Sequence, residues 1–288
     1  MSTLDLVYHF IAWLFPFDFM QFRFMQQACV ALILLAPITA FMGIPLINQR
    51  MVFFADAISH SAFTGVALGL ILHINPYWAM SIFAMLMAIS IIFTQQRTNL
   101  SSEAVTGVFF SGVIALGLVV VSREKRFNIQ IQQFLYGDIL TINTNEILIL
   151  LCLCCIIIIF QTWGYNRMLF TSLNPTLAKI HQIHVRTYQY LYAILLSLVV
   201  IFSVWIVGVL LVTALLIVPA ATARNFSKNA GQMVWWAFGV NLTSVLLGLF
   251  ISAQEWVNTA TGPTIILIAF GWFLLSLILL RIRKEKIV

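Results

Sequence analysis

Charged side chains are scarce in this chain: only 8% of its 288 residues are Asp, Glu, Lys or Arg, whereas 62% are hydrophobic. Soluble domains carry about 25% charged residues, so this chain cannot surround an ordinary core with a solvated shell. Apolar runs of roughly 17–25 residues recur along the whole length, and each is long enough to cross a bilayer. The sequence therefore predicts an all-α, polytopic membrane protein.

Three sequence signatures are also missing. No glycine-rich loop ends in Gly-Lys, so the chain has no phosphate cradle of the usual kind. No His-Glu-x-x-His pattern occurs, which argues against an intramembrane zinc hydrolase. The start of the chain lacks the basic region of a cleaved signal peptide, because Asp5 is the first charge, and we expect the N-terminus to be retained.

The four cysteines lie within apolar runs, and none pairs with a second loop cysteine as a disulfide framework would. Cys152 and Cys155 share a helix face, which would suit a soft metal. The favoured interpretation is that all four are small buried hydrophobic residues.

The net charge of +6 comes from basic residues between the apolar runs, as in topology signals, so we expect no nucleic-acid partner.

Residues 1–27 are rich in aromatic rings and are broken by Pro16, which predicts an amphipathic segment at the membrane interface in contact with lipid. Residues 28–288 then form the transmembrane domain. Its eight predicted full spans are 30–47, 55–72, 76–94, 104–121, 147–163, 190–207, 233–251 and 264–280.

From Tyr190 to Pro219 the chain carries no charge, and a straight helix over this stretch would be about 45 Å long. The hydrocarbon core is only about 30 Å thick. Basic residues flank both ends of the stretch, so both ends are predicted to face the cytoplasm. We therefore predict one full span, a break near Gly208 and a short return helix over 210–219, shielded from lipid by other helices. The C-terminus is then also cytoplasmic.

Asp56 and His60 are a pair of polar residues within the apolar runs and are the candidate metal ligands. They are four residues apart, so on a helix they lie on one face, one above the other. Such groups are expensive in a bilayer unless they face a cavity or each other. They supply half of a tetrahedral zinc site, and two copies of the chain would supply four ligands. The alternative is an Asp–His ion pair without a metal. Gly65 and Gly69 lie on another face and predict the close approach of a neighbouring helix.

The other polar groups are predicted to have ordinary roles. Glu103 suits a helix N-terminus. His181 and His184 lie in a basic segment and are expected to be solvated or to contact a partner. His73 lies in an external turn, where contact with incoming metal stays an alternative. The acidic residues assigned to the outside are expected to be loop charges; they are Asp138, Glu146 and Glu255.

The stretch Asp56-Ala-Ile-Ser-His60, followed by Gly65-Val-Ala-Leu-Gly69, resembles the signature of the membrane subunits of zinc, manganese and iron ABC importers. Four further stretches resemble that family in the same order and extend the likeness to essentially everything after residue 25. They are Phe-Leu-Tyr-Gly-Asp-Ile-Leu at 134–140, Asn-Pro-Thr-Leu-Ala-Lys-Ile-His at 174–181, Leu-Ile-Val-Pro-Ala-Ala-Thr-Ala-Arg at 216–224 and Thr-Gly-Pro-Thr-Ile-Ile-Leu at 261–267.

This resemblance implies a multi-pass permease of the bacterial cytoplasmic membrane that works as a dimer. Its implied partners are a dimer of cytoplasmic ATP-binding subunits and an extracytoplasmic metal-binding protein. Asp56 and His60 would line the metal path, and a cytoplasmic coupling segment would cover 172–183. The residues implied in coupling to the ATPase are Asn174, Pro175, Leu177, Ala178 and Lys179. The chain departs from the family near Asn174, where an acidic residue is usual.

The sequence thus favours the membrane subunit of an ATP-driven importer, with no permanently held cofactor and ATP hydrolysed on a separate subunit. A secondary transporter would show inverted repeats and several buried carboxylates, whereas Asp56 is nearly alone. Asp and His in a four-ligand site suit Zn²⁺, while Mn²⁺ prefers more oxygen ligands. The stretches 117–122 and 134–140 look most like the zinc branch of the family. Mn²⁺ and Fe²⁺ stay the alternatives.

Overall fold

The computed structural model describes residues 3–122, 139–173, 184–257 and 259–285, and within these ranges every regular element is a helix. Nine of the described helices are long and apolar enough to cross a membrane, so the prediction of an all-α polytopic protein is confirmed. They are α2 (Arg23–Asn48), α3 (Val52–Ile71), α4 (Pro76–Arg97), α5 (Ser102–Ser122), α7 (Thr144–Leu173), α9 (Val185–Val207), α10 (Val209–Phe226), α11 (Ala230–Ser252) and α12 (Thr261–Glu285).

The break near Gly208 lies where the sequence predicts it, but the return helix is longer than expected. Gly208 has φ 86° and ψ 161° and separates α9 from α10, and α10 continues through Pro219 to Phe226. A proline inside a helix leaves the carbonyl four residues earlier without its N–H partner. Here the Leu215 carbonyl accepts a hydrogen bond from Nδ2 of the buried Asn241 at 3.3 Å, so the helix does not end at the proline.

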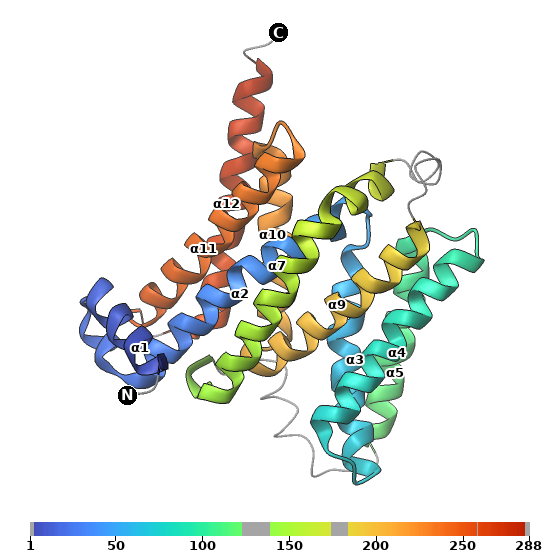
Figure 1. Ribbon diagram of the computed structural model, residues 1–288, viewed down its shortest axis with the longest axis horizontal. Helices are drawn as coiled ribbons and strands as arrows, with labels where there is room; N and C mark the ends of the chain where they lie inside the picture. Colours follow the sequence, from blue (N-terminus) through green and yellow to red (C-terminus); the bar gives the residue numbers. More distant parts are fainter. Residues whose placement is uncertain (1–2, 123–138, 174–183, 258, 286–288) are drawn as a thin grey trace.

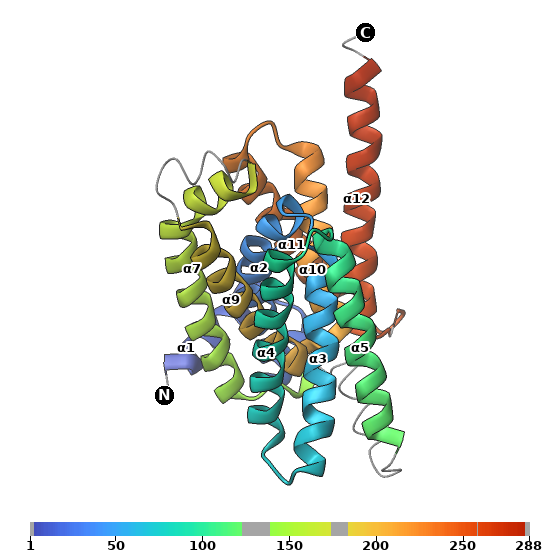
Figure 2. The ribbon, with the colours of Figure 1, turned by 90° about the vertical axis from the view of Figure 1, so that its right-hand side faces the viewer.

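Helix α2 is the centre of the bundle, because it packs against α7, α10 and α11 and its apolar window is 72% buried. On one side α9 packs against α4 and α7, and α3 packs against α4 and α5. On the other side α10, α11 and α12 pack against one another. Helices α5 and α12 stand at the edge of the molecule (Figures 1 and 2), and only 22% and 17% of their apolar windows are buried.

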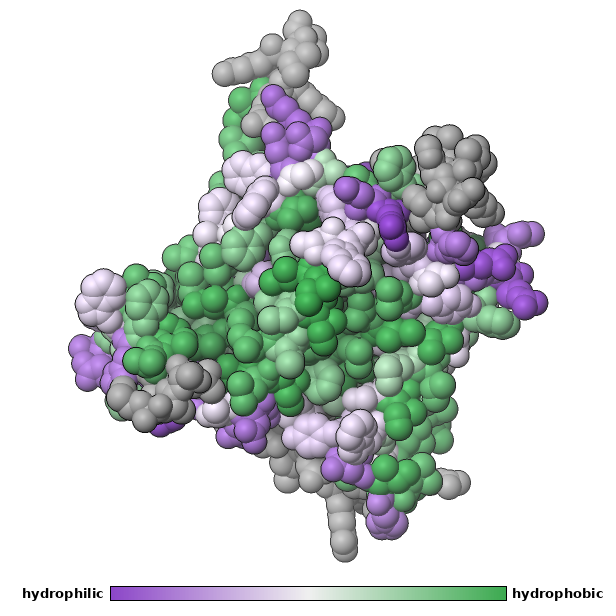
Figure 3. Space-filling view, viewed as in Figure 1, coloured by the Kyte–Doolittle hydropathy of each residue, from purple (hydrophilic) through white to green (hydrophobic). Residues whose placement is uncertain are grey.

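The helices run up and down along one axis, so their ends gather at two opposite ends of the molecule (Figure 2). The last turns of α2, α4, α7, α10 and α12 lie at one end, and the turn between α3 and α4 lies at the other. A broad hydrophobic surface covers α2, α7 and α9 between more polar borders (Figure 3). Such a band is what a lipid-facing surface requires.

The N-terminal segment forms α1 (Thr3–Leu14) and the 3-10 turn η1 (Asp18–Gln21), and α1 lies across the bundle instead of along it (Figure 2). One face of α1 is buried through Tyr8 and Ile11, whereas Phe10 and Trp13 are exposed. The helix is therefore amphipathic. Helix α2 begins at Arg23, so its first turn lies within the predicted interfacial segment 1–27. The location of this segment at the membrane interface stays a prediction.

Candidate metal-binding site

Asp56 and His60 both lie in the first half of α3, as the sequence predicts. His60 is eight residues after Val52, the first residue of the helix, which places it roughly 12 Å along the axis. Both side chains are half-buried, whereas the alanines and serines around them are buried. The two side chains therefore lie within the bundle but are partly exposed.

The neighbours of the pair lie on α5 and α10. The Asp56 carboxyl group lies beside the side chain of Thr213 on α10. The Thr213 hydroxyl donates its one hydrogen to the Leu210 carbonyl at 3.3 Å, which leaves the lone pairs of the Asp56 carboxylate available to a cation. His60 meets the Phe110 ring of α5 edge to face, with centroids 5.2 Å apart. Its imidazole takes part in no hydrogen bond with the described residues, so a ring nitrogen is available as a ligand.

Close packing on both sides fixes α3 in place. A Cβ at Gly65 would lie 2.8 Å from the Met80 Cα of α4, and one at Gly69 would lie 2.6 Å from the Ala79 Cβ. The predicted close approach of another helix is confirmed, and that helix is α4. On the α5 side the Thr64 hydroxyl donates to the Val113 carbonyl at 3.0 Å. The pair is thus carried by a rigid element, which a binding site requires.

One copy of the chain does not complete a metal site in the part that the structure describes. No group of three or more His, Cys, Asp or Glu side chains gathers there. Asp56 and His60 supply two ligands, whereas a closed zinc site takes four. The other histidines of the prediction lie elsewhere: His73 is exposed in the α3–α4 turn, and the exposed His184 precedes α9. Within the described residues the pair therefore leaves two of the four ligand positions of such a site open.

The structure also tests the predictions for Glu103 and for the four cysteines. Glu103 lies in the first turn of α5, where Ser101 caps the Ala104 N–H, so its predicted role is confirmed. Cys29 and Cys154 are buried, but Cys152 and Cys155 are exposed, so the prediction of burial is wrong for those two. The coupling residues lie outside the described residues, as do Asp138 and His181; the coupling residues are Asn174, Pro175, Leu177, Ala178 and Lys179.

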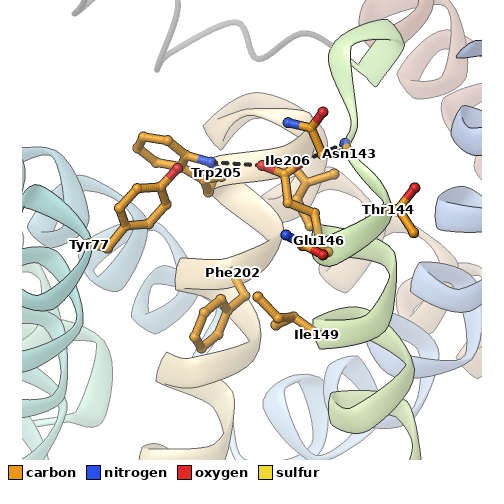
Figure 4. A pocket seen from close by; sticks show the side chains of 9 residues that line it. Tyr77, Asn143, Thr144, Glu146, Ile149, Phe202, Trp205 and Ile206 are labelled. Atoms are coloured by element: carbon orange, nitrogen blue, oxygen red, sulfur yellow. Dashed lines mark hydrogen bonds between the residues drawn. The ribbon is translucent and has the colours of Figure 1, made fainter.

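Glu146 is the residue whose setting the sequence missed. It was expected to be a loop charge, but it lies in the first turn of α7 and lines a cavity of about 530 Å³ between α4, α7 and α9 (Figure 4). Tyr77 and Trp205 form one wall of that cavity, with ring centroids 4.1 Å apart. The only sequence signal for this cavity was that Tyr77 and Trp205 lie near the ends of two predicted spans. Aromatic residues are common at that position in membrane proteins, so the signal is weak.

Comparison with known proteins identifies related chains over almost the whole length. A family model described as the ABC 3 transport family matches residues 21–280. The high-affinity zinc uptake system membrane protein ZnuB of Haemophilus influenzae is 32% identical over 257 residues, which cover 89% of this chain and 98% of the relative. The manganese import system permease protein ScaB of Streptococcus gordonii is 31% identical over 270 residues, which cover 93% and 96% of the two chains.

Solved structures share the fold. PsaBC from Streptococcus pneumoniae in complex with Fab superposes with a TM-score of 0.76 at 30% identity and covers 88% of this chain and 91% of that chain. An inward-facing conformation of a putative metal-chelate type ABC transporter superposes with a TM-score of 0.71 at 14% identity. The second likeness concerns the fold alone. Zinc and manganese proteins both occur among the sequence relatives.

Proposed function

Because the chain belongs to the ABC 3 transport family, we propose that it is the membrane subunit that carries Zn²⁺ across the membrane in an ATP-driven importer. The chain is a multi-pass membrane permease of the metal importer type and not an enzyme. The observation that carries the proposal for its site is the pair Asp56 and His60, half-buried one turn apart on α3.

A second copy of the chain completes the site in this proposal. Asp56 and His60 are half-buried beside α10 and α5, and the outer helices α5 and α12 are the least buried of the described spans. A twofold axis beside this face would bring two carboxylates and two imidazoles around one ion. These are ligand types that zinc accepts in tetrahedral geometry. Each copy then holds the ion weakly by itself, which suits a site that must also release it.

Zinc is favoured over manganese by the chemistry of the ligands. Half of the donors in the completed site are imidazole nitrogens, and zinc binds imidazole well at four-coordinate sites. Manganese prefers more oxygen ligands and a higher coordination number, which water would have to supply beside these two residues. The Thr213 hydroxyl of α10 is a further oxygen beside Asp56. Mn²⁺ and Fe²⁺ are the alternative cargoes.

ATP is hydrolysed on a separate cytoplasmic subunit in this proposal, and metal arrives from an extracytoplasmic binding protein. Both partners follow from the type of transporter to which the family belongs. The segment 172–183 is the proposed contact with the ATPase. Membrane lipid surrounds the hydrophobic band of Figure 3.

The test is metal uptake by cells that express the complete importer with single substitutions in this chain. Asp56→Ala and His60→Ala should each lower the initial rate of zinc uptake by at least about tenfold, because each removes two of the four ligands from the dimer. The purified wild-type transporter should bind one zinc ion per two chains, and neither variant should retain it. Manganese measured in parallel decides between the two cargoes.

The matched control is His73→Asn, which removes a histidine from the exposed α3–α4 turn. His73 has φ 55°, a left-handed conformation that asparagine tolerates, so the turn should keep its shape. This variant should take up zinc at the wild-type rate. Wild-type uptake by both Asp56→Ala and His60→Ala would refute the site, and a faster wild-type uptake of manganese than of zinc would refute the choice of metal.

A further inference from the structure

A cavity lies between the first turns of α4 and α7 and the last turn of α9, and neither Asp56 nor His60 is among its described lining residues. It has a volume of about 530 Å³, within the range of roughly 300–1,000 Å³ that small-molecule sites occupy. Its walls combine three aromatic rings with one carboxylate and a polar rim (Figure 4). The rings are Tyr77, Phe202 and Trp205, and the carboxylate is Glu146.

Neighbouring groups hold the Glu146 carboxylate in place. Its Oε2 accepts the backbone N–H of Asn143 at 2.9 Å, and its Oε1 accepts the indole N–H of Trp205 at 3.3 Å. These two hydrogen bonds fix the orientation of the carboxylate at the cavity wall. No lysine or arginine lines the cavity among the residues that the structure describes. The described lining residues therefore supply no counterion for this carboxylate, which is open to pairing with a cationic ligand.

An organic ammonium fits this cavity better than a metal ion. A dication needs several carboxylate, imidazole or thiolate ligands, and Glu146 is the only such group among the described lining residues. The faces of Tyr77 and Trp205 attract a cation that lies over them. A primary ammonium placed beside these two rings can also donate a hydrogen bond to the Glu146 carboxylate.

The surface next to the cavity indicates that the ammonium belongs to a lipid. Ile149 of α7 lines the cavity and is 40% exposed, and the side chains one and two turns further along the same face, Cys152 and Ile156, are exposed too. On α9 the half-buried Leu198 and Leu195 continue the face of Phe202. Both stripes run into the hydrophobic band of Figure 3, so an acyl chain can lie along α7 and α9 while its headgroup enters the cavity.

We propose that this cavity binds a phospholipid with an ammonium headgroup, with the ammonium between Glu146 and the rings of Tyr77 and Trp205. The amide and hydroxyl groups of Asn143 and Thr144 at the rim donate to the lipid phosphate. The bound lipid fills the seam between α4, α7 and α9 and ties the ends of these three helices together.

The experiment is native mass spectrometry of the full-length protein, titrated with phosphatidylethanolamine or with phosphatidylglycerol of the same acyl chains. The wild type should bind the ethanolamine lipid more tightly, by a factor on the order of ten, because only that headgroup pairs with a carboxylate and aromatic faces. Glu146→Gln keeps an acceptor for the Asn143 N–H but loses the charge, and it should abolish the preference. Soluble glycerophosphoethanolamine, which has no acyl chains, should not compete at similar concentrations.

Glu255→Gln is the matched control, because it removes a carboxylate from an exposed position outside the cavity. It should leave the lipid preference unchanged. Three results would overturn the proposal: equal binding of the two lipids by the wild type, an unchanged preference in Glu146→Gln, or competition by the soluble headgroup as strong as by the lipid. Thermal unfolding of both variants shows whether a lost preference reflects a lost fold.

Discussion

Two buried amide side chains pair with carbonyl groups that prolines leave free in neighbouring helices. Pro45 cannot donate to the Phe41 carbonyl, and Gln161 of α7 donates to that carbonyl at 2.7 Å. Pro219 likewise leaves the Leu215 carbonyl, and Asn241 of α11 donates to it. In a membrane interior no water can replace these donors. The amides therefore let α2 and α10 continue through their prolines.

We expect Asn241→Leu to lower the free energy of unfolding by about 1–2 kcal/mol, because hydrogen bonds between membrane helices are worth about this much. The Asn241 amide also lies 3.0 Å from the Ala36 carbonyl and 2.6 Å from the Thr39 hydroxyl. Its loss would loosen α2, α10 and α11 together. Thermal unfolding in detergent measures the change.

Thr243→Val on the same helix is the control for this substitution. Thr243 is exposed, and its hydroxyl contacts only carbonyls of α11 itself, those of Gly239 and Val240. The free energy of unfolding should change by less than about 0.5 kcal/mol, as for most surface substitutions. An equal loss in the two variants would mean that the amide bridge does not stabilise the bundle.

At the scale of helices, the break at Gly208 decides how α10 approaches α3. With φ 86° and ψ 161°, Gly208 has a backbone conformation that is essentially restricted to glycine. The chain reverses there without a loop, so α10 returns beside α9. Because α10 carries Thr213, this reversal places the Thr213 hydroxyl next to Asp56.

Gly208→Ala should therefore lower both stability and transport. The strained conformation should cost about 1–3 kcal/mol of unfolding free energy, and a relaxed backbone would shift Thr213 away from Asp56. The control Gly239→Ala lies within α11, where an added Cβ meets nothing within 4 Å, so it should gain up to about 1 kcal/mol from helix propensity. Thermal unfolding and metal uptake by both variants test this, and a Gly208→Ala protein as stable as the Gly239→Ala protein would contradict it.

The spans were predictable from the sequence because hydropathy and the flanking charges are local properties. The end of α10 was not predictable, because a proline such as Pro219 usually ends a helix. Only the structure shows that Asn241 donates a hydrogen bond to the Leu215 carbonyl, which Pro219 leaves without a partner. The spacing of Asp56 and His60 predicts a shared face, but no local pattern predicts that Thr213, far along the chain, lies beside it. Exposure of Cys152 was missed for a related reason, since lipid-facing and core-facing residues are equally apolar.

Over the whole molecule, charge is distributed unevenly between the two ends. The basic residues of the described ranges lie almost entirely at the end where α12 finishes; they are Arg50, Arg97, Arg167, Arg186, Arg224, Lys228, Arg281, Arg283 and Lys284. Arg23 is the described basic residue of the opposite end, which also carries Asp18, Glu146 and Glu255. Membrane proteins keep arginine and lysine in cytoplasmic loops. The end at which α12 finishes is therefore predicted to face the cytoplasm.

Single cysteines placed in a chain whose four native cysteines are replaced by alanine test this orientation. Glu255→Cys lies in the exposed turn after α11 and should react with a membrane-impermeant maleimide added to intact spheroplasts. Asn99→Cys lies in the exposed turn between α4 and α5, at the opposite end, and should react only after the membrane is permeabilised. The reverse pattern would place Asp56 and His60 near the outer surface, since both lie in the half of α3 that begins at the Arg50 end. Metal would then reach the pair before crossing the bilayer, so the labelling result decides whether these residues stand near the exit or the entrance of the path.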